Sequence, residues 1–169
     1  LRTVRILSGA DSSLGHLFGF QHLLLATVRL FGDQWPHYYR ETVRHRWFWG
    51  NTLNPLDTRA RIVADGRHWL VHGTKSFCSG AMDADQLVVS AVSERDGKLV
   101  VAAIPPGRAG IRINADWDNM GQRQTDSGSV EFHGVRVYDH EILRNPGPLG
   151  SVYASLRSLI AQLILTNIY

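Results

Sequence analysis

The residues from Gly73 to Ala81 bring together side chains that suit a flat ligand. They read Gly-Thr-Lys-Ser-Phe-Cys-Ser-Gly-Ala and lie between two apolar runs. In an extended segment, Phe77 and Ser79 project to the same face, because side chains alternate with a period of two. An aromatic wall with a hydroxyl two residues away suits a heteroaromatic ring with polar atoms. The same residue types are typical of a β-turn followed by a half-buried strand, and the spacing alone leaves both interpretations open.

Other patterns that resemble catalytic or metal sites are weaker. His68 and His72 are four residues apart, but on a strand this spacing separates them by about 13 Å, too far to share a metal ion. In Asp116-Trp117-Asp118 the two carboxylates suit acid–base chemistry, and a loop anchored by a buried tryptophan is an equally good interpretation. Neither common glycine-rich phosphate-binding loop is present. We therefore expect no metal site and no such phosphate loop.

The composition is that of a folded domain. The chain has 169 residues, of which 44% are hydrophobic and 20% are charged. A net charge of +3 with scattered arginines disfavours nucleic acid as the main partner. The sequence has no run of about 18 uncharged apolar residues, so we expect no membrane span. The single cysteine, Cys78, excludes an intramolecular disulfide and a cysteine-based zinc site, and it fits a cytoplasmic location.

Helical patterns lie at both ends of the chain, and strand patterns lie between them. The apolar periodicity predicts helices over residues 13–30, 34–44 and 151–168. Short strand patterns between them are separated by turn signals such as Asp65-Gly66. We therefore predict an α+β fold with an antiparallel β-sandwich or barrel flanked by helices. Because the chain starts without Met and ends within an apolar pattern, we also expect it to be a fragment of a longer protein.

The order and spacing of several motifs resemble those of the acyl-CoA dehydrogenase superfamily. These motifs lie at residues 48–51, 65–66, 73–79, 119–127, 130–132 and 135–137. A second set resembles the flavin-dependent monooxygenase branch of that superfamily, the dibenzothiophene monooxygenase type, at residues 12–20, 77–81, 116–117, 123–129 and 163–169. Together the motifs cover nearly the whole chain.

The resemblance implies an architecture of three parts. Residues 1–45 would be the end of an N-terminal helical domain, and residues 46–147 would be a middle β-domain. Residues 148–169 would be the first helix of a C-terminal helical bundle that is truncated in this chain. The resemblance also implies a homotetramer for the complete protein.

The same resemblance implies which residues meet a flavin. Ser79 would hydrogen-bond the flavin ring near N5, while Phe77 and Cys78 would contact the ring beside it. Asn51 would lie at the ring edge where oxygen reacts. Ser79 and Asn51 are thus predicted to be catalytic as well as cofactor-binding, since both supply neutral hydrogen-bond partners.

On the substrate side, the resemblance places three further residues. His16 and Phe20 would face the substrate pocket from the helical side, and Trp117 would face it from the β side. The ordinary pKa of histidine lies in the range that is useful for protonating or stabilising a peroxide, so His16 is predicted to be catalytic. The alternative for His16 is an ordinary core histidine on a helix face.

The implied activity is that of a flavin-dependent monooxygenase. Reduced FMN, supplied by a separate flavin reductase, would react with O2 through a C4a-hydroperoxyflavin and oxygenate a small molecule that contains sulfur or nitrogen. FAD is the alternative cofactor. No partner of another class, neither nucleic acid nor membrane, is expected.

Two alternative functions stay open. The first is an FAD-dependent acyl-CoA dehydrogenase. Such enzymes carry Thr-Glu-Pro and then Gly-Ser-Asp in the loop after the helices, whereas this chain reads Leu-Asn-Pro-Leu-Asp-Thr at residues 53–58, which counts against dehydrogenation. The second is a non-catalytic β-domain fragment without flavin, because a cofactor needs both walls of its site to exclude water.

Overall fold

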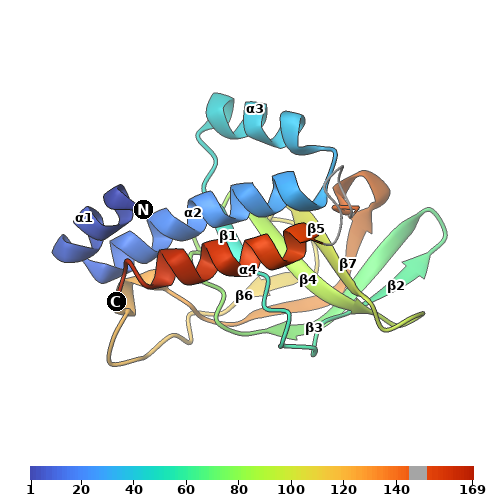
Figure 1. Ribbon diagram of the computed structural model, residues 1–169. Helices are drawn as coiled ribbons and strands as arrows, with labels where there is room; N and C mark the ends of the chain where they lie inside the picture. Colours follow the sequence, from blue (N-terminus) through green and yellow to red (C-terminus); the bar gives the residue numbers. More distant parts are fainter. Residues whose placement is uncertain (145–151) are drawn as a thin grey trace.

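Figure 1 shows the computed structural model, which describes residues 1–144 and 152–169. The α-helices are α1 (Arg2–Ala10), α2 (Ser12–Phe31), α3 (Trp35–His45) and α4 (Val152–Leu165), and the 3-10 helices are η1 (Arg123–Thr125) and η2 (Asp139–Glu141). The strands are β1 (Trp49–Thr52), β2 (Arg61–Asp65), β3 (His68–Lys75), β4 (Gln86–Ser93), β5 (Leu99–Ile104), β6 (Ile111–Ile113) and β7 (Val130–Tyr138). None of the described helices is long and apolar enough to span a membrane.

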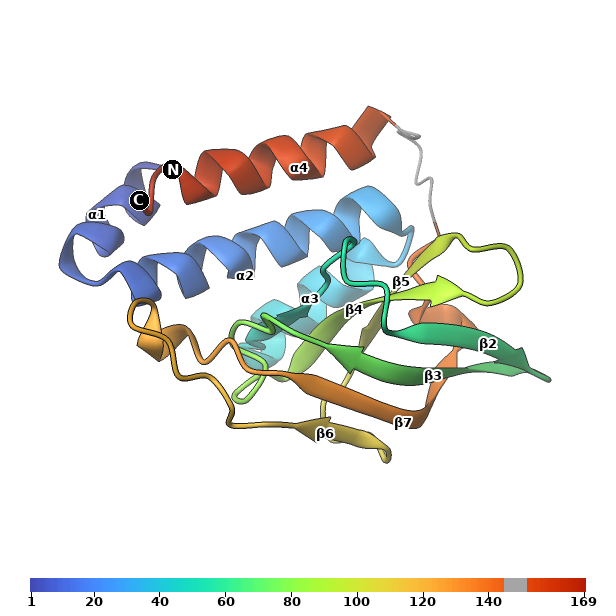
Figure 2. The same ribbon diagram turned by 90° about the horizontal axis from the view of Figure 1, so that it is seen from below.

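The seven strands form one sheet, which is curled into a half-barrel (Figure 2). Their order is β1-β4-β2-β3-β7-β6, and β5 pairs with β4 off this path. The predicted α+β fold with helices around a β-domain is confirmed. The pairs β1–β4 and β2–β4 are parallel, so the sheet is mixed rather than wholly antiparallel. Side chains alternate in the same way in parallel and in antiparallel strands. The alternation in the sequence therefore could not show which strands pair in parallel.

Strand β4 lies at the centre of the core. All eight of its residues are buried, because it has strands on both edges and covered faces. Leu87 and Val89 face the core that the sheet encloses. Val88 points the other way and packs in a second cluster with Leu24 and Val28 of α2. The alternation along β4 therefore fixes α2 against one face of the sheet.

Helix α4 lies beside α2 in both views (Figures 1 and 2). Helix α2 begins after Asp11, whose carboxylate accepts a hydrogen bond from the Leu14 N–H at 2.9 Å, as an N-cap does. Leu23 of α2 packs against Ile164 of α4 in a third cluster. A Cβ at Gly19 would lie 2.5 Å from the Ile164 side chain, so the glycine allows the two helices to approach closely. This contact holds α4 above the end of the sheet.

The three predicted helices correspond to α2, α3 and the described part of α4, whereas α1 was not predicted. The predicted hairpin turn at Asp65-Gly66 joins β2 to β3. The domain bounds 1–45, 46–147 and 148–169 stay a prediction. The segment around Pro146 and Pro148 lies outside the described residues.

Candidate functional site

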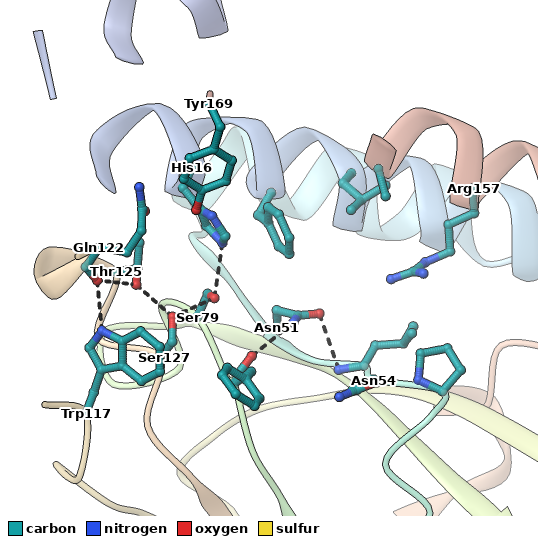
Figure 3. A pocket seen from close by; sticks show the side chains of 16 residues that line it. His16, Asn51, Asn54, Ser79, Trp117, Gln122, Thr125, Ser127, Arg157 and Tyr169 are labelled. Carbon is teal, nitrogen blue, oxygen red and sulfur yellow. Dashed lines mark hydrogen bonds between the residues drawn. The ribbon is translucent and has the colours of Figure 1, made fainter. Parts of the chain in front are cut away.

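A cavity of about 430 Å³ lies where α2 and α4 meet one end of the sheet (Figure 3). It is formed by α2, α4, β1 and the loop after it, the loop after β3, and the segment around η1. The residues that line it are His16, Phe20, Leu23, Asn51, Leu53, Asn54, Pro55, Phe77, Ser79, Trp117, Gln122, Thr125, Ser127, Arg157, Ala161 and Tyr169. None of these lining residues is acidic, and only Arg157 carries a permanent charge.

His16 lies on α2 at the edge of this cavity (Figure 3). Its Nε2 atom lies 3.2 Å from Ser79 Oγ, and its ring stacks on Phe20 with 4.1 Å between the ring centroids. Burial lowers the pKa of His16 to about 4, because the imidazolium loses hydration. The ring is therefore neutral near pH 7. Its Nδ1 atom is buried and has no hydrogen-bond partner among the described residues.

Ser79 begins a row of hydroxyls that ends at a backbone carbonyl (Figure 3). Ser79 Oγ lies 2.8 Å from Ser127 Oγ, which lies 2.7 Å from Thr125 Oγ1. Thr125 Oγ1 donates to the carbonyl oxygen of Gln122 at 2.8 Å. The same carbonyl also accepts from Trp117 Nε1–H at 2.8 Å. The row thus connects the loop after β3 with the segment around η1.

The carbonyl at its end determines the direction of each hydrogen in this row. A carbonyl oxygen only accepts, so the single hydroxyl hydrogen of Thr125 points to Gln122. Ser127 must then donate to Thr125, and Ser79 must donate to Ser127, because each hydroxyl has one hydrogen. His16 therefore carries its hydrogen on Nε2 and donates it to Ser79, which leaves a lone pair on Nδ1. Ser79 keeps its second lone pair for a ligand.

Asn51 of β1 holds the loop that carries Ser79. Its backbone N–H donates to the Ser79 carbonyl at 3.0 Å, and its Nδ2 donates to the Phe77 carbonyl at 3.4 Å. Its Oδ1 accepts from the Leu53 N–H at 3.3 Å. An amide NH2 group has two hydrogens, so one hydrogen of Nδ2 remains for a ligand in the cavity.

The loop at residues 76–79 is not an extended strand, which corrects the prediction that alternation places Phe77 and Ser79 on one face. Strand β3 ends at Lys75, and Phe77 has a φ of 58°, in the left-handed region. Both side chains line the cavity nonetheless. The Phe77 ring is 62% exposed and meets Trp117 edge to face, with 5.9 Å between the centroids. Together these two rings form the aromatic wall of the site.

The side chain of Cys78 is not brought to the cavity, which corrects its prediction as a cofactor contact. It is buried in the core that the sheet encloses. Burial raises the pKa of the thiol to about 12, so it stays protonated. Its backbone N–H is also engaged, because it donates to the Gly128 carbonyl at 3.0 Å. Neighbouring residues in a bent loop point in different directions, and the sequence did not show this bend.

The acidic pair around Trp117 forms a loop and not a paired-acid site. Asp116 accepts from the Ser129 N–H at 2.7 Å and from the Ser129 hydroxyl at 2.6 Å, and these bonds lower its pKa. Asp118 pairs on the surface with Arg123 at 3.0 Å. Of the three residues only Trp117 lines the cavity. Among the described residues, no group of three or more His, Cys, Asp or Glu is placed to hold a metal ion.

Several lining residues with polar groups were not predicted, among them Thr125, Ser127 and Arg157. Thr125 and Ser127 lie in a motif that carried the family resemblance, but nothing in their spacing showed that Ser127 would meet Ser79, almost 50 residues earlier, at 2.8 Å. Arg157 lies on α4, where its Nε donates to Thr27 Oγ1 at 3.1 Å. Burial lowers the pKa of Arg157. A lone arginine within the apolar pattern of the last helix was the signal that could have indicated it.

Comparison with known proteins places this site in a family. Residues 50–135 match the model of the acyl-CoA dehydrogenase middle domain. The probable FMNH2-dependent monooxygenase SfnC of Pseudomonas putida is 55% identical over 170 residues, which cover 98% of this chain and 43% of that protein.

Solved structures agree with this match. Methanesulfinate monooxygenase MsuC from Pseudomonas fluorescens is 54% identical with a TM-score of 0.93, and the match covers 98% of this chain and 43% of that chain. The complex of TdsC from Paenibacillus sp. A11-2 with FMN and indole is 44% identical with a TM-score of 0.90, over 98% of this chain and 45% of that one. The chain thus spans less than half the length of these relatives. The predicted resemblance is confirmed, and the chain belongs to the acyl-CoA dehydrogenase family, whose middle domain it contains.

Proposed function

We propose that the complete protein is a flavin-dependent monooxygenase that uses reduced FMN and O2 to oxygenate a small molecule containing sulfur or nitrogen. The relatives that are similar over nearly the whole chain support this proposal, because their names include an FMNH2-dependent monooxygenase and a complex with FMN. The observation that carries it is the neutral pair of His16 and Ser79 at an aromatic-walled cavity. Neutral hydrogen-bond partners beside an aromatic wall suit oxygen chemistry on a flavin.

The residues of the cavity fit a flavin ring. Phe77 and Trp117 offer an aromatic wall, and the volume of about 430 Å³ is in the usual range of ligand sites. Ser79 offers a lone pair and Asn51 offers an N–H, which match the alternating polar atoms of the ring. The buried Nδ1 of His16 lacks a partner among the described residues and would gain one from a bound ligand.

The reaction divides between the cofactor and these side chains. The reduced flavin would supply two electrons, so that one oxygen atom of O2 enters the substrate and the other leaves as water. Ser79 and Asn51 would orient the ring, while Phe20 and Leu23 would exclude water from it. His16 is neutral near pH 7, which disfavours the predicted role as a proton donor. Its Nδ1 would instead accept a hydrogen bond or a proton within the site.

Three features of the complete protein belong to the same proposal. FMNH2 dependence, as named for the relative, requires a reductase that regenerates the reduced cofactor, and we propose that it is a separate protein. We also propose a homotetramer and a cytoplasmic location. The single buried thiol of this chain is compatible with that compartment.

The test uses the complete purified protein, chemically reduced FMN and ¹⁸O2, with methanesulfinate and indole as trial substrates. We expect a product that carries one ¹⁸O atom, and no oxidation of NADH unless a flavin reductase is added. Desaturation of an acyl-CoA thioester without oxygen incorporation would show a dehydrogenase instead. Failure to bind FMN in either redox state would support the non-catalytic alternative.

A further inference from the structure

We propose that Arg157 makes this cavity a site for a small organic oxoanion, such as an alkanesulfinate, rather than for a neutral heterocycle. This inference rests on the proposed monooxygenase function and narrows its substrate class. Figure 3 shows Arg157 on α4, with its guanidinium directed toward the space between α4 and the loop that carries Asn54.

Among the described residues, one neutral hydrogen-bond partner holds Arg157. Its Nε donates to Thr27 Oγ1 at 3.1 Å. Thr27 is fully buried and donates its own hydroxyl hydrogen to the Leu23 carbonyl at 2.8 Å, so a lone pair is directed at the arginine. The edge formed by its two terminal nitrogens makes no hydrogen bond to a described residue. Such an edge of a guanidinium can bind two oxygens at once.

The charge of Arg157 has no counterpart in the described part of the chain. No acidic residue lines the cavity, His16 is neutral, and none of the ion pairs of the described residues involves Arg157. Burial lowers its pKa, in agreement with a cation that has lost water without gaining a carboxylate. A desolvated cation is costly until it is paired. A bound anion would remove this cost, whereas a neutral ring would increase it.

A sulfinate has the chemistry that this arrangement requires. Its two oxygens match the free edge of the guanidinium, and its sulfur keeps a lone pair for oxidation. The balanced step is RSO2⁻ + O2 + FMNH2 → RSO3⁻ + FMN + H2O, in which sulfur gains one oxygen and the flavin loses two electrons and two protons. The relative named methanesulfinate monooxygenase is consistent with such a substrate.

The test compares Arg157→Met, Arg157→Lys and the exposed control Arg67→Met in the complete protein. We expect Arg157→Met to lower kcat/KM for methanesulfinate by about 10- to 100-fold relative to kcat/KM for indole, through KM, because a charge-assisted bidentate contact is lost. Arg157→Lys keeps the charge without the paired edge and should fall between. Arg67→Met, at a hairpin turn, should match the parent protein.

A binding measurement separates this proposal from the proposed function. Calorimetry with methanesulfinate and the flavin-free protein should show binding that Arg157→Met weakens and Arg67→Met keeps. Thr27→Val removes the acceptor of Nε but keeps the arginine, and it should weaken the same binding. If no variant oxygenates any substrate while this binding pattern holds, the function is wrong and the anion site stands.

Two results would overturn the anion site. The first is an unchanged methanesulfinate affinity in Arg157→Met, as expected if a carboxylate beyond this chain neutralises the arginine. The second is a loss of affinity for FMN but not for riboflavin, together with an unchanged KM for methanesulfinate. That result would assign Arg157 to the cofactor phosphate.

Discussion

Two partly buried arginines of this chain, Arg108 and Arg157, differ in the hydrogen-bond partners that replace water. Arg108 is surrounded by partners, since its terminal nitrogens donate to the two carboxylate oxygens of Glu141 at 2.6 and 2.5 Å and to the Arg136 carbonyl at 2.7 Å. Its guanidinium also lies 5.3 Å from the centroid of the Tyr138 ring. Arg157 has a single hydrogen bond among the described residues, to a neutral hydroxyl.

This difference in partners distinguishes Arg108, which stabilises the fold, from Arg157, which we propose binds a ligand. Arg108 joins the loop before β6 to β7 and η2, and all of its strong partners are supplied by the chain. Arg157 lines a cavity, and the described residues leave the edge formed by its two terminal nitrogens unused. We therefore take an arginine whose hydrogen-bond and charge partners are all supplied by the chain to stabilise the fold. We take a fixed arginine that lacks some of these partners to bind a ligand.

The largest loss of stability should come from removing Arg108, whose partners are all supplied by the chain. Arg108→Met leaves the Glu141 carboxylate buried without its cation, and loss of one partner of a buried ion pair costs about 3–5 kcal/mol. Arg157→Met removes no ion pair of the described residues and should change the free energy of unfolding by less than about 1 kcal/mol. Urea unfolding of both variants of the complete protein measures this. Equal losses in the two variants would contradict the comparison.

The same contrast extends to His16, which has one satisfied and one unsatisfied nitrogen. Its pKa is about 4 in the folded protein and 6.5 in an ordinary environment, so the unfolded chain binds more protons between these pH values. Stability should therefore fall as the pH falls from 6.5 toward 4, and at pH 5 the loss due to this residue should be about 2 kcal/mol.

The control for this prediction is His16→Gln, which keeps a polar side chain but does not titrate. Unfolding free energies at pH 7 and pH 5 are measured for both proteins, and the difference between the two pH values should be smaller in the variant. All other groups are the same in both proteins and cancel in the comparison. If the two proteins lose equal stability, His16 is not held neutral by the fold.

The smallest effect concerns the row of hydroxyls. Thr125→Val removes the group that fixes its direction, while the Gln122 carbonyl still accepts from Trp117. The loss of one hydrogen bond should cost about 0.5–1.5 kcal/mol. The ¹⁵N spectrum of His16 should change from one tautomer, with hydrogen on Nε2, to a mixture of two. Thr125→Ser restores the hydroxyl and should restore the single tautomer, whereas a single tautomer in Thr125→Val would refute the ordering.

Local rules predicted the parts of the fold that depend on neighbouring residues. The turn at Asp65-Gly66 and the periodicities of α2 and α3 concern only a few consecutive positions. The parallel pairing of β1 with β4 depends instead on how the chain between them crosses the sheet. The sequence pattern contains no information on that path.

The site was predictable to the extent that the family resemblance identified its residues. His16, Asn51 and Ser79 lie together as that resemblance implied. What remained hidden depends on contacts between distant segments, such as Arg157 with Thr27, which are 130 positions apart. The bend at Phe77 also remained hidden, because a left-handed φ is unusual for a phenylalanine and the turn residues of this segment did not locate the bend.

The one-way order of the hydroxyl row has a consequence for the exchange of cofactor. Ser79 offers a ligand a lone pair and no hydrogen. It therefore favours a ligand atom that donates a hydrogen bond and disfavours one that only accepts. In the proposed arrangement, N5 of the flavin carries a hydrogen when reduced and none when oxidised. The row would therefore favour binding of the reduced cofactor over the oxidised cofactor. This difference in affinity would require no movement of the protein.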